Sequence, residues 1–367
     1  MRKIKNIVCI LFFAIFTLTF GAACIFKEPI QILVSERRKA AQFPELSAES
    51  IMNKSFFDGL EAYLADQFPL RDEFRELKAV IQMKLLGQKD NDGVYLAHGH
   101  ISELQTTLNE SSVQKTAKKI NSIREKYLDG RNTNVYCSVI PDKNYYLAAA
   151  NGYPSLDYGK MIEIFATNLE GVEYIDIFDC LDAESYYKTD SHWKQERLNA
   201  VVERISQKMN FIAKPVSEYT AEELSDFEGV YASRLAFGYE KDKIIALTDE
   251  ITQSAKVSDI ERGEDYTGVY NKSKLKSYDK YDVFLSGASA LITVENPLAK
   301  EKRELVIFRD SFGSSLAPLL LSGYSKITLA DIRYISSQIL DEYISFENCD
   351  ILFIYNAQIL NQSSVLK

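Results

Sequence analysis

The first hydrophobic segment of the chain is long enough to cross a membrane. It extends without a charge from Asn6 to Phe26 and follows the basic start MRKIK. About 20 apolar residues in a helix match the thickness of the hydrocarbon core. Because the basic residues come first, we expect the N-terminus to be cytoplasmic and the rest of the chain to lie outside. We favour an uncleaved signal anchor over residues 1–26; a cleaved signal peptide and lipidation at Cys24 are the alternatives.

Two helical patterns follow this segment, separated by Pro69. The first, over residues 47–68, places apolar side chains near helical spacing at Ile51, Phe56, Leu60, Tyr63 and Leu64. The second, over residues 70–87, does so at Phe74, Leu77, Val80, Ile81 and Leu85, and closes with Gly87. We therefore expect residues 27–90 to form a membrane-proximal helical segment.

From residue 91 onward, short apolar runs alternate with helical patterns. Runs rich in β-branched and aromatic residues predict strands at 134–140, 172–181, 304–310, 326–335 and 350–356. Helical patterns occupy residues 111–128, 193–209, 314–324 and 336–344. This alternation predicts an α/β domain over 91–367, with a parallel sheet flanked by helices. Residues 214–280 are polar and weakly patterned, so we expect an insertion or lid there.

Composition and charge narrow the classes of function. The chain is 46% hydrophobic and 26% charged, which is typical of a globular protein. Its net charge of −9 argues against a nucleic-acid partner, since that affinity rests on clustered Lys and Arg. Cys137, Cys180 and Cys349 lie apart without metal-site spacing, and their disulfide state stays open. No cofactor motif is present, and no metal is expected.

One candidate for chemistry lies in YYKTDSHWKQERL, residues 186–198, which holds the only Trp of the chain. Asp190 stands two positions before His192, so its carboxylate can accept from Nδ1–H and leave Nε2 as a base. Alternatively, Thr189, Asp190 or Ser191 caps a helix that begins near His192. The two other His, His98 and His100, alternate in an expected hairpin strand, without the Cys or carboxylate cluster of a metal site.

The second candidate is ELVIFRDSFGSSLAPLL, residues 304–320. An apolar strand leads into Arg309–Gly313 and a helix follows, which places Ser311 on a strand-to-helix turn. A serine there is a nucleophile geometry of several hydrolase folds, and its own N–H faces a developing oxyanion. Alternatively, Asp310 is an N-cap and Ser311 an ordinary first-turn residue. A serine nucleophile needs a base and an orienting carboxylate, so the two candidates support each other.

These residues resemble the DHHW family of bacterial extracytoplasmic proteins. The likeness rests on TDSHW and RDSFG, in that order, and continues through FPELS, DQFPLRDEF, DGVYL, DKYDVFLSG, SFGSSLAPLLLSGY and ADIRY, most of the chain beyond the anchor. That family is similar to the SGNH-hydrolase-like domains of alginate O-acetyltransferases. The chain departs from the family name at Ser191, where a second His would stand, and at Arg309, where SGNH enzymes usually have Gly.

The resemblance implies a role for each of the candidate residues. Asp190 would orient His192, His192 would act as base and Ser311 as nucleophile. Gly287 and Asn356 are candidates for the oxyanion hole, and Arg333 for substrate binding, although an ion pair with Asp331 is the alternative for Arg333.

The implied function is an O-acetyltransferase acting on a cell-surface or secreted polysaccharide. A multi-pass membrane acyltransferase would be its acyl-donor partner. A carbohydrate esterase is the alternative within enzymes. A non-catalytic glycan-binding or assembly protein of the cell envelope is the alternative outside them.

Overall fold

A computed structural model describes residues 2–131 and 133–367. The chain forms two compact units. The first contains the chain up to Asp92 together with Ala232–Gly238, and the second contains Gly93–Tyr231 and Tyr239–Lys367. Both candidate motifs for chemistry lie in the second unit.

The first unit is mainly helical. Its N-terminal helix, α1 (Arg2–Phe26), carries the span Ile4–Cys24, which is long and apolar enough to cross a membrane. The connector after it forms the short hairpin β1 (Ile32–Leu33) and β2 (Arg38–Lys39). The remaining elements are α2 (Ala48–Met52), α3 (Ser55–Asp66), α4 (Arg71–Val80) and the π-helical turn Ile81–Leu85.

The helix expected over residues 47–68 is divided in two. Lys54 adopts a left-handed conformation with φ of 70°, and the Asn53 side chain accepts from the N–H of Ser55. An L-residue in this conformation cannot continue a right-handed helix. The apolar spacing therefore predicted the helical segments correctly but could not show the break between them.

An eight-stranded sheet organises the second unit, in the order β10-β9-β11-β13-β12-β14-β5-β6. The five strands from β13 to β6 are parallel, which confirms the predicted α/β class. β11, β9 and β10 extend the sheet antiparallel. The bounds are β5 Val135–Ile140, β6 Glu173–Tyr174, β9 Lys256–Asp259, β10 Glu264–Thr267, β11 Leu291–Glu295, β12 Glu304–Arg309, β13 Lys326–Ala330 and β14 Cys349–Asn356.

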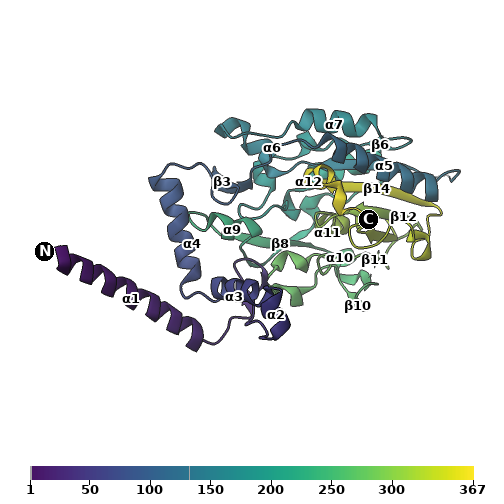
Figure 1. Ribbon diagram of the computed structural model, residues 1–367. Helices are drawn as coiled ribbons and strands as arrows, with labels where there is room; N and C mark the ends of the chain where they lie inside the picture. The colour runs from purple at the N-terminus through teal and green to yellow at the C-terminus, as the bar shows by residue number, and fades with distance from the viewer. Residues whose placement is uncertain (1, 132) are drawn as a thin grey trace. The chain divides into compact units, whose positions relative to one another are not determined.

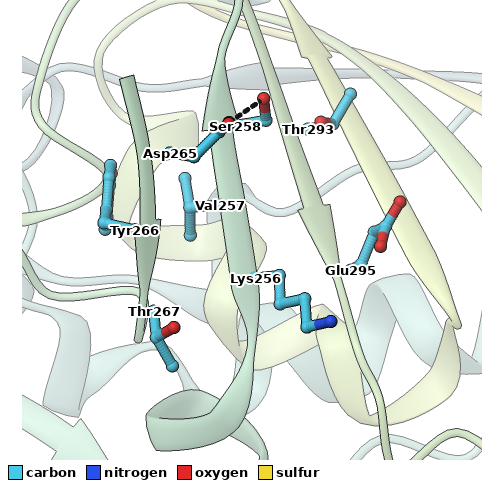
Figure 2. A pocket seen from close by; sticks show the side chains of 8 residues that line it. All are labelled: Lys256, Val257, Ser258, Asp265, Tyr266, Thr267, Thr293 and Glu295. Atoms are coloured by element: carbon cyan, nitrogen blue, oxygen red, sulfur yellow. Dashed lines mark hydrogen bonds between the residues drawn. The ribbon is translucent and has the colours of Figure 1, made fainter.

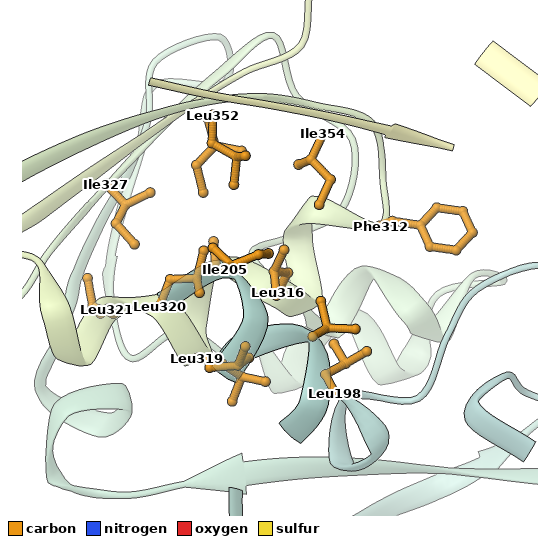
Figure 3. Packing of buried hydrophobic residues seen from close by; sticks show 14 of the residues in the cluster. Leu198, Ile205, Phe312, Leu316, Leu319, Leu320, Leu321, Ile327, Leu352 and Ile354 are labelled. Carbon is orange, nitrogen blue, oxygen red and sulfur yellow. The ribbon is translucent and has the colours of Figure 1, made fainter. Parts of the chain in front are cut away.

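Helices cover both faces of this sheet because the central strands are apolar on both sides. Along β14, Leu352 and Ile354 enter one core, whereas Ile351 and Phe353 enter the other. The first core receives α8 (Asn199–Lys208) and α11 (Gly313–Leu320), whose packed side chains appear in Figure 3. The second receives α5 (Glu110–Tyr127), α7 (Tyr158–Thr167) and α12 (Ala357–Asn361); α5 and α7 lie on the same side of the sheet in Figure 1.

Several stretches differ from the sequence-based expectations. The strand expected over 172–181 is only Glu173–Tyr174, followed by a 3-10 turn at Phe178–Cys180. The helix expected over 336–344 is absent, and a 3-10 turn at Leu340–Glu342 stands there instead. In that turn the N–H of Leu340 donates to the Tyr127 hydroxyl at 3.3 Å, so a tertiary bond takes the place of a helical one.

The weakly patterned stretch 214–280 contains ordered elements. It holds the hairpin β7 (Thr220–Phe227) and β8 (Asp242–Thr248), as well as α9 (Val230–Leu235) and α10 (Glu250–Ser254). It also supplies β9 and β10 of the main sheet. A hollow of about 380 Å³ lies over these strands and β11, lined by side chains such as Lys256, Tyr266 and Glu295 (Figure 2). None of its lining residues is a candidate for chemistry.

Candidate active site

Three neighbouring strands of the sheet end at the candidate site. β12 leads into the turn with Ser311, β14 ends at Asn356, and β5 leads through Pro141 to Lys143. Because β12, β14 and β5 are parallel and adjacent, these residues follow their carboxyl ends at the same edge. Ligands of open α/β sheets bind at this edge.

The loop that carries Asp190 and His192 is a tight turn closed by its own backbone. Tyr186 and Trp193 form an antiparallel bridge, and the N–H of Tyr187 donates to the carbonyl of His192 at 3.1 Å. No helix begins near His192: a 3-10 turn starts at Gln195 and α8 only at Asn199. The helix-cap interpretation of this motif is therefore wrong.

Asp190 is fully buried, and hydrogen bonds hold both of its carboxylate oxygens. Its Oδ1 accepts from the backbone N–H of His192 at 3.0 Å and from the ring Nδ1 at 2.6 Å. Its Oδ2 accepts from the N–H of Val230 at 2.9 Å. With Nδ1 as the donor, Nε2 is left unprotonated and able to accept a proton.

The hydrogen-bonded chain continues to Ser311. His192 Nε2 lies 2.7 Å from Ser311 Oγ, although the two residues are 119 positions apart in the sequence. Ser311 is partly exposed, and the side chain of His192 is 12% exposed. The structure thus brings Ser311, His192 and Asp190 together in one hydrogen-bonded chain. This is the arrangement that a serine nucleophile, its base and the carboxylate that orients the base require.

The turn that holds Ser311 is supported from beneath by Asp310. The Asp310 carboxylate accepts from the N–H of Phe312 at 3.0 Å and from that of Asn356 at 2.7 Å. It therefore ties the turn to the end of β14. The bond to the N–H two residues further on is the bond that an N-cap side chain makes, so Asp310 caps the turn that leads into α11. Burial raises the pKa of the Asp310 carboxyl, and the two N–H donors oppose that shift.

The backbone N–H of Ser311 is available to a ligand. Within residues 2–131 and 133–367 it makes no hydrogen bond, whereas the next N–H groups donate to the turn. Ser311 precedes α11, an eight-residue helix, so the N–H lies at a positive helix end. An oxyanion forming on a carbonyl bound to Ser311 Oγ is the charge that such a donor stabilises.

Aromatic rings hold the imidazole of His192 in its plane. The ring of Tyr281 stacks on it with centroids 3.9 Å apart and an interplanar angle of 15°. The ring of Phe312 contacts it at 4.7 Å. Tyr281 Oη and Trp193 Nε1 both bond to Ser315 Oγ, at 2.8 and 2.9 Å, which fixes both rings to α11. Trp193 is fully buried and serves to pack the loop against the helix.

A close backbone approach supports the Asp190 loop from behind. The N–H of Gly229 donates to the Thr189 hydroxyl at 2.8 Å. A Cβ at Gly229 would lie 2.3 Å from both Asp190 Cβ and the Thr189 carbonyl oxygen. Only glycine fits this contact. Asp242 completes the support by accepting from the N–H groups of Lys188 and Thr189 at 2.7 and 2.8 Å.

The remaining sequence candidates take structural positions. The N–H of Gly287 already donates to the carbonyl of Phe284 at 3.1 Å, which leaves it no donor for an oxyanion. The Asn356 side chain accepts from the N–H of Gln358 at 2.9 Å, and its amide lies 3.4 Å from the Ile140 carbonyl. Arg333 forms a bidentate ion pair with Asp331, at 2.9 and 2.6 Å.

The two other histidines do not form a paired site. His98 lies with φ of 50° in the turn between β3 (Val94–Ala97) and β4 (His100–Glu103), so the expected alternation within one strand is wrong. His100 Nε2 lies 3.0 Å from Glu184 Oε1. Among the described residues, no group of three or more His, Cys, Asp or Glu side chains is arranged to hold a metal.

Sequence reasoning missed one charged residue at this site, Lys143. Its side chain is 2% exposed, and its ammonium donates to carbonyls of the Asp190 loop. Burying an ammonium costs on the order of several kcal/mol unless it is paired and hydrogen-bonded, so a buried lysine is rare. One feature of the sequence could have drawn attention to Lys143. It stands in the stretch PDK, which directly follows a buried strand at the sheet edge where ligands bind.

The fold and the site together define an α/β protein with a mostly parallel sheet and a Ser–His–Asp hydrogen-bonded chain at the carboxyl ends of its strands. Comparison with protein-family profiles gives no match, and neither does comparison with curated protein sequences. Solved structures do match. A DHHW family protein from Eubacterium siraeum aligns with a TM-score of 0.61 and 21% identity, over 75% of this chain and 94% of its own.

Bacillus cereus PatB1 is also similar, with a TM-score of 0.56 and 17% identity over 73% of this chain and 96% of its own. A structure of the same protein with a sulfonyl adduct aligns with a TM-score of 0.57 and 17% identity, over 73% of this chain and 95% of that one. The resemblance to the DHHW family is thereby confirmed at the level of the fold.

Proposed function

We propose that this chain is an extracytoplasmic acyl-ester enzyme, an O-acetyltransferase that acts on a polysaccharide through Ser311, His192 and Asp190. The observation that carries the proposal is the unbroken chain of short contacts, 2.6 Å from Asp190 to His192 and 2.7 Å from His192 to Ser311. A helix cap or a packing contact requires neither of these distances. The similarity of fold to a DHHW family protein and to PatB1 is consistent with this assignment.

The proposed reaction has two steps. In the first, His192 Nε2 takes the Ser311 proton while Oγ attacks the acyl carbonyl, and the N–H of Ser311 donates to the oxyanion. The imidazolium then gives its proton to the leaving group, which departs and leaves an acyl-serine. In the second step, His192 takes a proton from an acceptor hydroxyl, which attacks the acyl-serine. The bond between Oγ and the acyl carbon then breaks, and the imidazolium returns the proton to Ser311 Oγ. Asp190 holds the ring and stabilises its charge throughout.

The acceptor of the acyl group decides whether the enzyme is a transferase or an esterase: a sugar hydroxyl makes it a transferase, and water makes it an esterase. We expect the purified protein to release p-nitrophenol from p-nitrophenyl acetate slowly in water, and faster when an oligosaccharide is added. The faster release should be matched by acetylated oligosaccharide, measured by mass spectrometry. Release without acetylated sugar would identify an esterase. No release that depends on Ser311, with glycan binding retained, would favour the non-catalytic alternative.

The proposed location follows from the first unit. We propose that α1 is an uncleaved anchor that leaves the catalytic unit outside the cytoplasm, close to a membrane acyltransferase that supplies acetyl groups. The hydropathy of Ile4–Cys24 supports this, as does the packing of Phe20 on Phe68 and Phe74, with ring centroids 5.1 and 5.9 Å apart. These rings join the last turns of α1 to the start of α4.

The anchor proposal predicts that the protein stays in the membrane pellet after alkaline extraction of cells. Its intact mass should include residues before Asn6, and a protease added outside the cell should cleave the ectodomain. A mature chain beginning near Cys24 would instead show that the apolar segment is a cleaved signal.

A further inference from the structure

The side chain of Lys143 converges on the backbone of the loop that carries the acid–base pair. Lys143 is the first residue of α6 (Lys143–Leu147), directly after β5 and Asp142. Its Nζ donates to the carbonyls of Tyr187 at 2.7 Å, Lys188 at 3.2 Å and Asp190 at 2.8 Å. An ammonium has three donors, so all of them are used on this one loop.

We propose that Lys143 is a positioning residue of the active site, whose charged ammonium sets the loop geometry that points His192 at Ser311. The inference rests on the proposed function and adds to it a fourth side chain that touches neither substrate nor reacting atoms. Its effect passes through the backbone: the carbonyl of Asp190 is held by Lys143, while the carboxylate of Asp190 holds the imidazole.

Two side chains of opposite charge, Asp242 and Lys143, bind the backbone of the loop. Asp242 accepts hydrogen bonds from the N–H groups of Lys188 and Thr189, whereas the Lys143 ammonium donates to carbonyls of the same loop. Each carbonyl would be left without its donor if the ammonium were replaced by an apolar group, and buried carbonyls need a partner. The loop would then rearrange, and an imidazole displaced by about 1 Å loses on the order of a hundredfold in rate.

The charge of Lys143 depends on its surroundings. Burial lowers the pKa of Lys143 to about 7, and the two nearby carboxylates oppose this shift. The titratable and aromatic groups around it are Asp190, Asp242, Lys194, His100 and the Tyr231 ring, whose centroid is 5.4 Å from Nζ. A neutral amine has only two donors, so one loop carbonyl loses its bond when the proton leaves. Activity should therefore decline as the pH rises above about 7.

The test uses the full chain with p-nitrophenyl acetate between pH 6 and 9. For Lys143→Met we expect kcat to fall about a hundredfold at pH 7 with KM within about twofold, because the loop and not the substrate contact is altered. The remaining rate should no longer decline above pH 7. Lys143→Arg, which stays charged, should recover part of kcat and shift the alkaline decline upward.

Lys188→Met is the matched control. It also removes one lysine charge, in this case from the loop itself, but the Lys188 ammonium pairs with the exposed Glu240 at 2.8 Å. This variant should keep wild-type kcat and the wild-type pH profile. A folded Lys143→Met with wild-type kcat and the same alkaline decline overturns the inference, and so does a wild type whose activity does not decline between pH 7 and 9, even where a variant fails to fold. Activity that survives Ser311→Ala would instead overturn the proposed function itself.

Discussion

Ser311→Ala is expected to lower the rate of p-nitrophenyl acetate turnover by about 10⁴-fold or more, to near the level of the buffer. The reason is that no other group stands where Oγ does, 2.7 Å from His192 Nε2. Removing the nucleophile of a serine triad leaves only oxyanion stabilisation and binding. The measurement is initial rate with saturating ester, since the change should appear in kcat.

A neighbouring serine provides the matched control. Ser314 lies in the first turn of α11 and is 1% exposed, and its Oγ has no hydrogen-bond partner among the described residues. Ser314→Ala removes a serine hydroxyl three positions further along the chain, in the helix that follows Ser311, without removing a contact of His192. Its rate should therefore stay within about twofold of wild type. Equal losses in both variants would mean that the helix start, and not the Ser311 hydroxyl, was disturbed.

Asp190→Asn is expected to lower kcat by roughly 10³- to 10⁴-fold while leaving the fold intact. The carboxylate accepts from two N–H groups of His192 and from the N–H of Val230. An asparagine must turn its NH₂ toward at least one of them, because it offers one oxygen in place of two. The favoured outcome is the wrong imidazole tautomer, with a proton on Nε2 facing Ser311.

Ser191→Ala separates this effect from a general disturbance of the loop. The Ser191 hydroxyl lies 3.5 Å from Asp190 Oδ1, too far to hold the carboxylate firmly. Its loss should cost less than about twofold in kcat, measured with the same ester. An Asp190→Asn variant as active as Ser191→Ala would remove the orienting role from the account.

The sheet could be inferred from the sequence because its strands follow local patterns. The link between the two motifs could be inferred because a serine nucleophile requires a base and an orienting carboxylate. The uninterrupted apolar strands at β12 and β14 predict burial on both faces, and the turn after β12 predicts an exposed Ser311. Local pattern failed where tertiary contacts decide the backbone. Leu340 has helical spacing with Ile344, yet its N–H bonds to Tyr127 from α5, more than 200 positions away.

The supports of the site could not be inferred for the same reason. Lys143 and Asp242 resemble solvated surface charges in the sequence, and their burial results from strands that are distant along the chain. Gly229 lies in a stretch without periodicity, and its close approach to Asp190 is visible only in three dimensions. The reacting groups could therefore be recognised in the sequence, whereas Lys143, Asp242 and Gly229 could be recognised as their supports only in the structure.

The central claim is that Ser311 forms an acyl-enzyme with the help of His192. Acid quenching during p-nitrophenyl acetate turnover, followed by peptide mass spectrometry, tests it directly. The account predicts an added acetyl group on the peptide that contains Ser311, absent from Ser311→Ala and formed far more slowly in Asp190→Asn when samples are quenched at successive early times. An acetyl group found on another residue, or one that forms on the Ser311 peptide of Asp190→Asn at the wild-type rate, would contradict it.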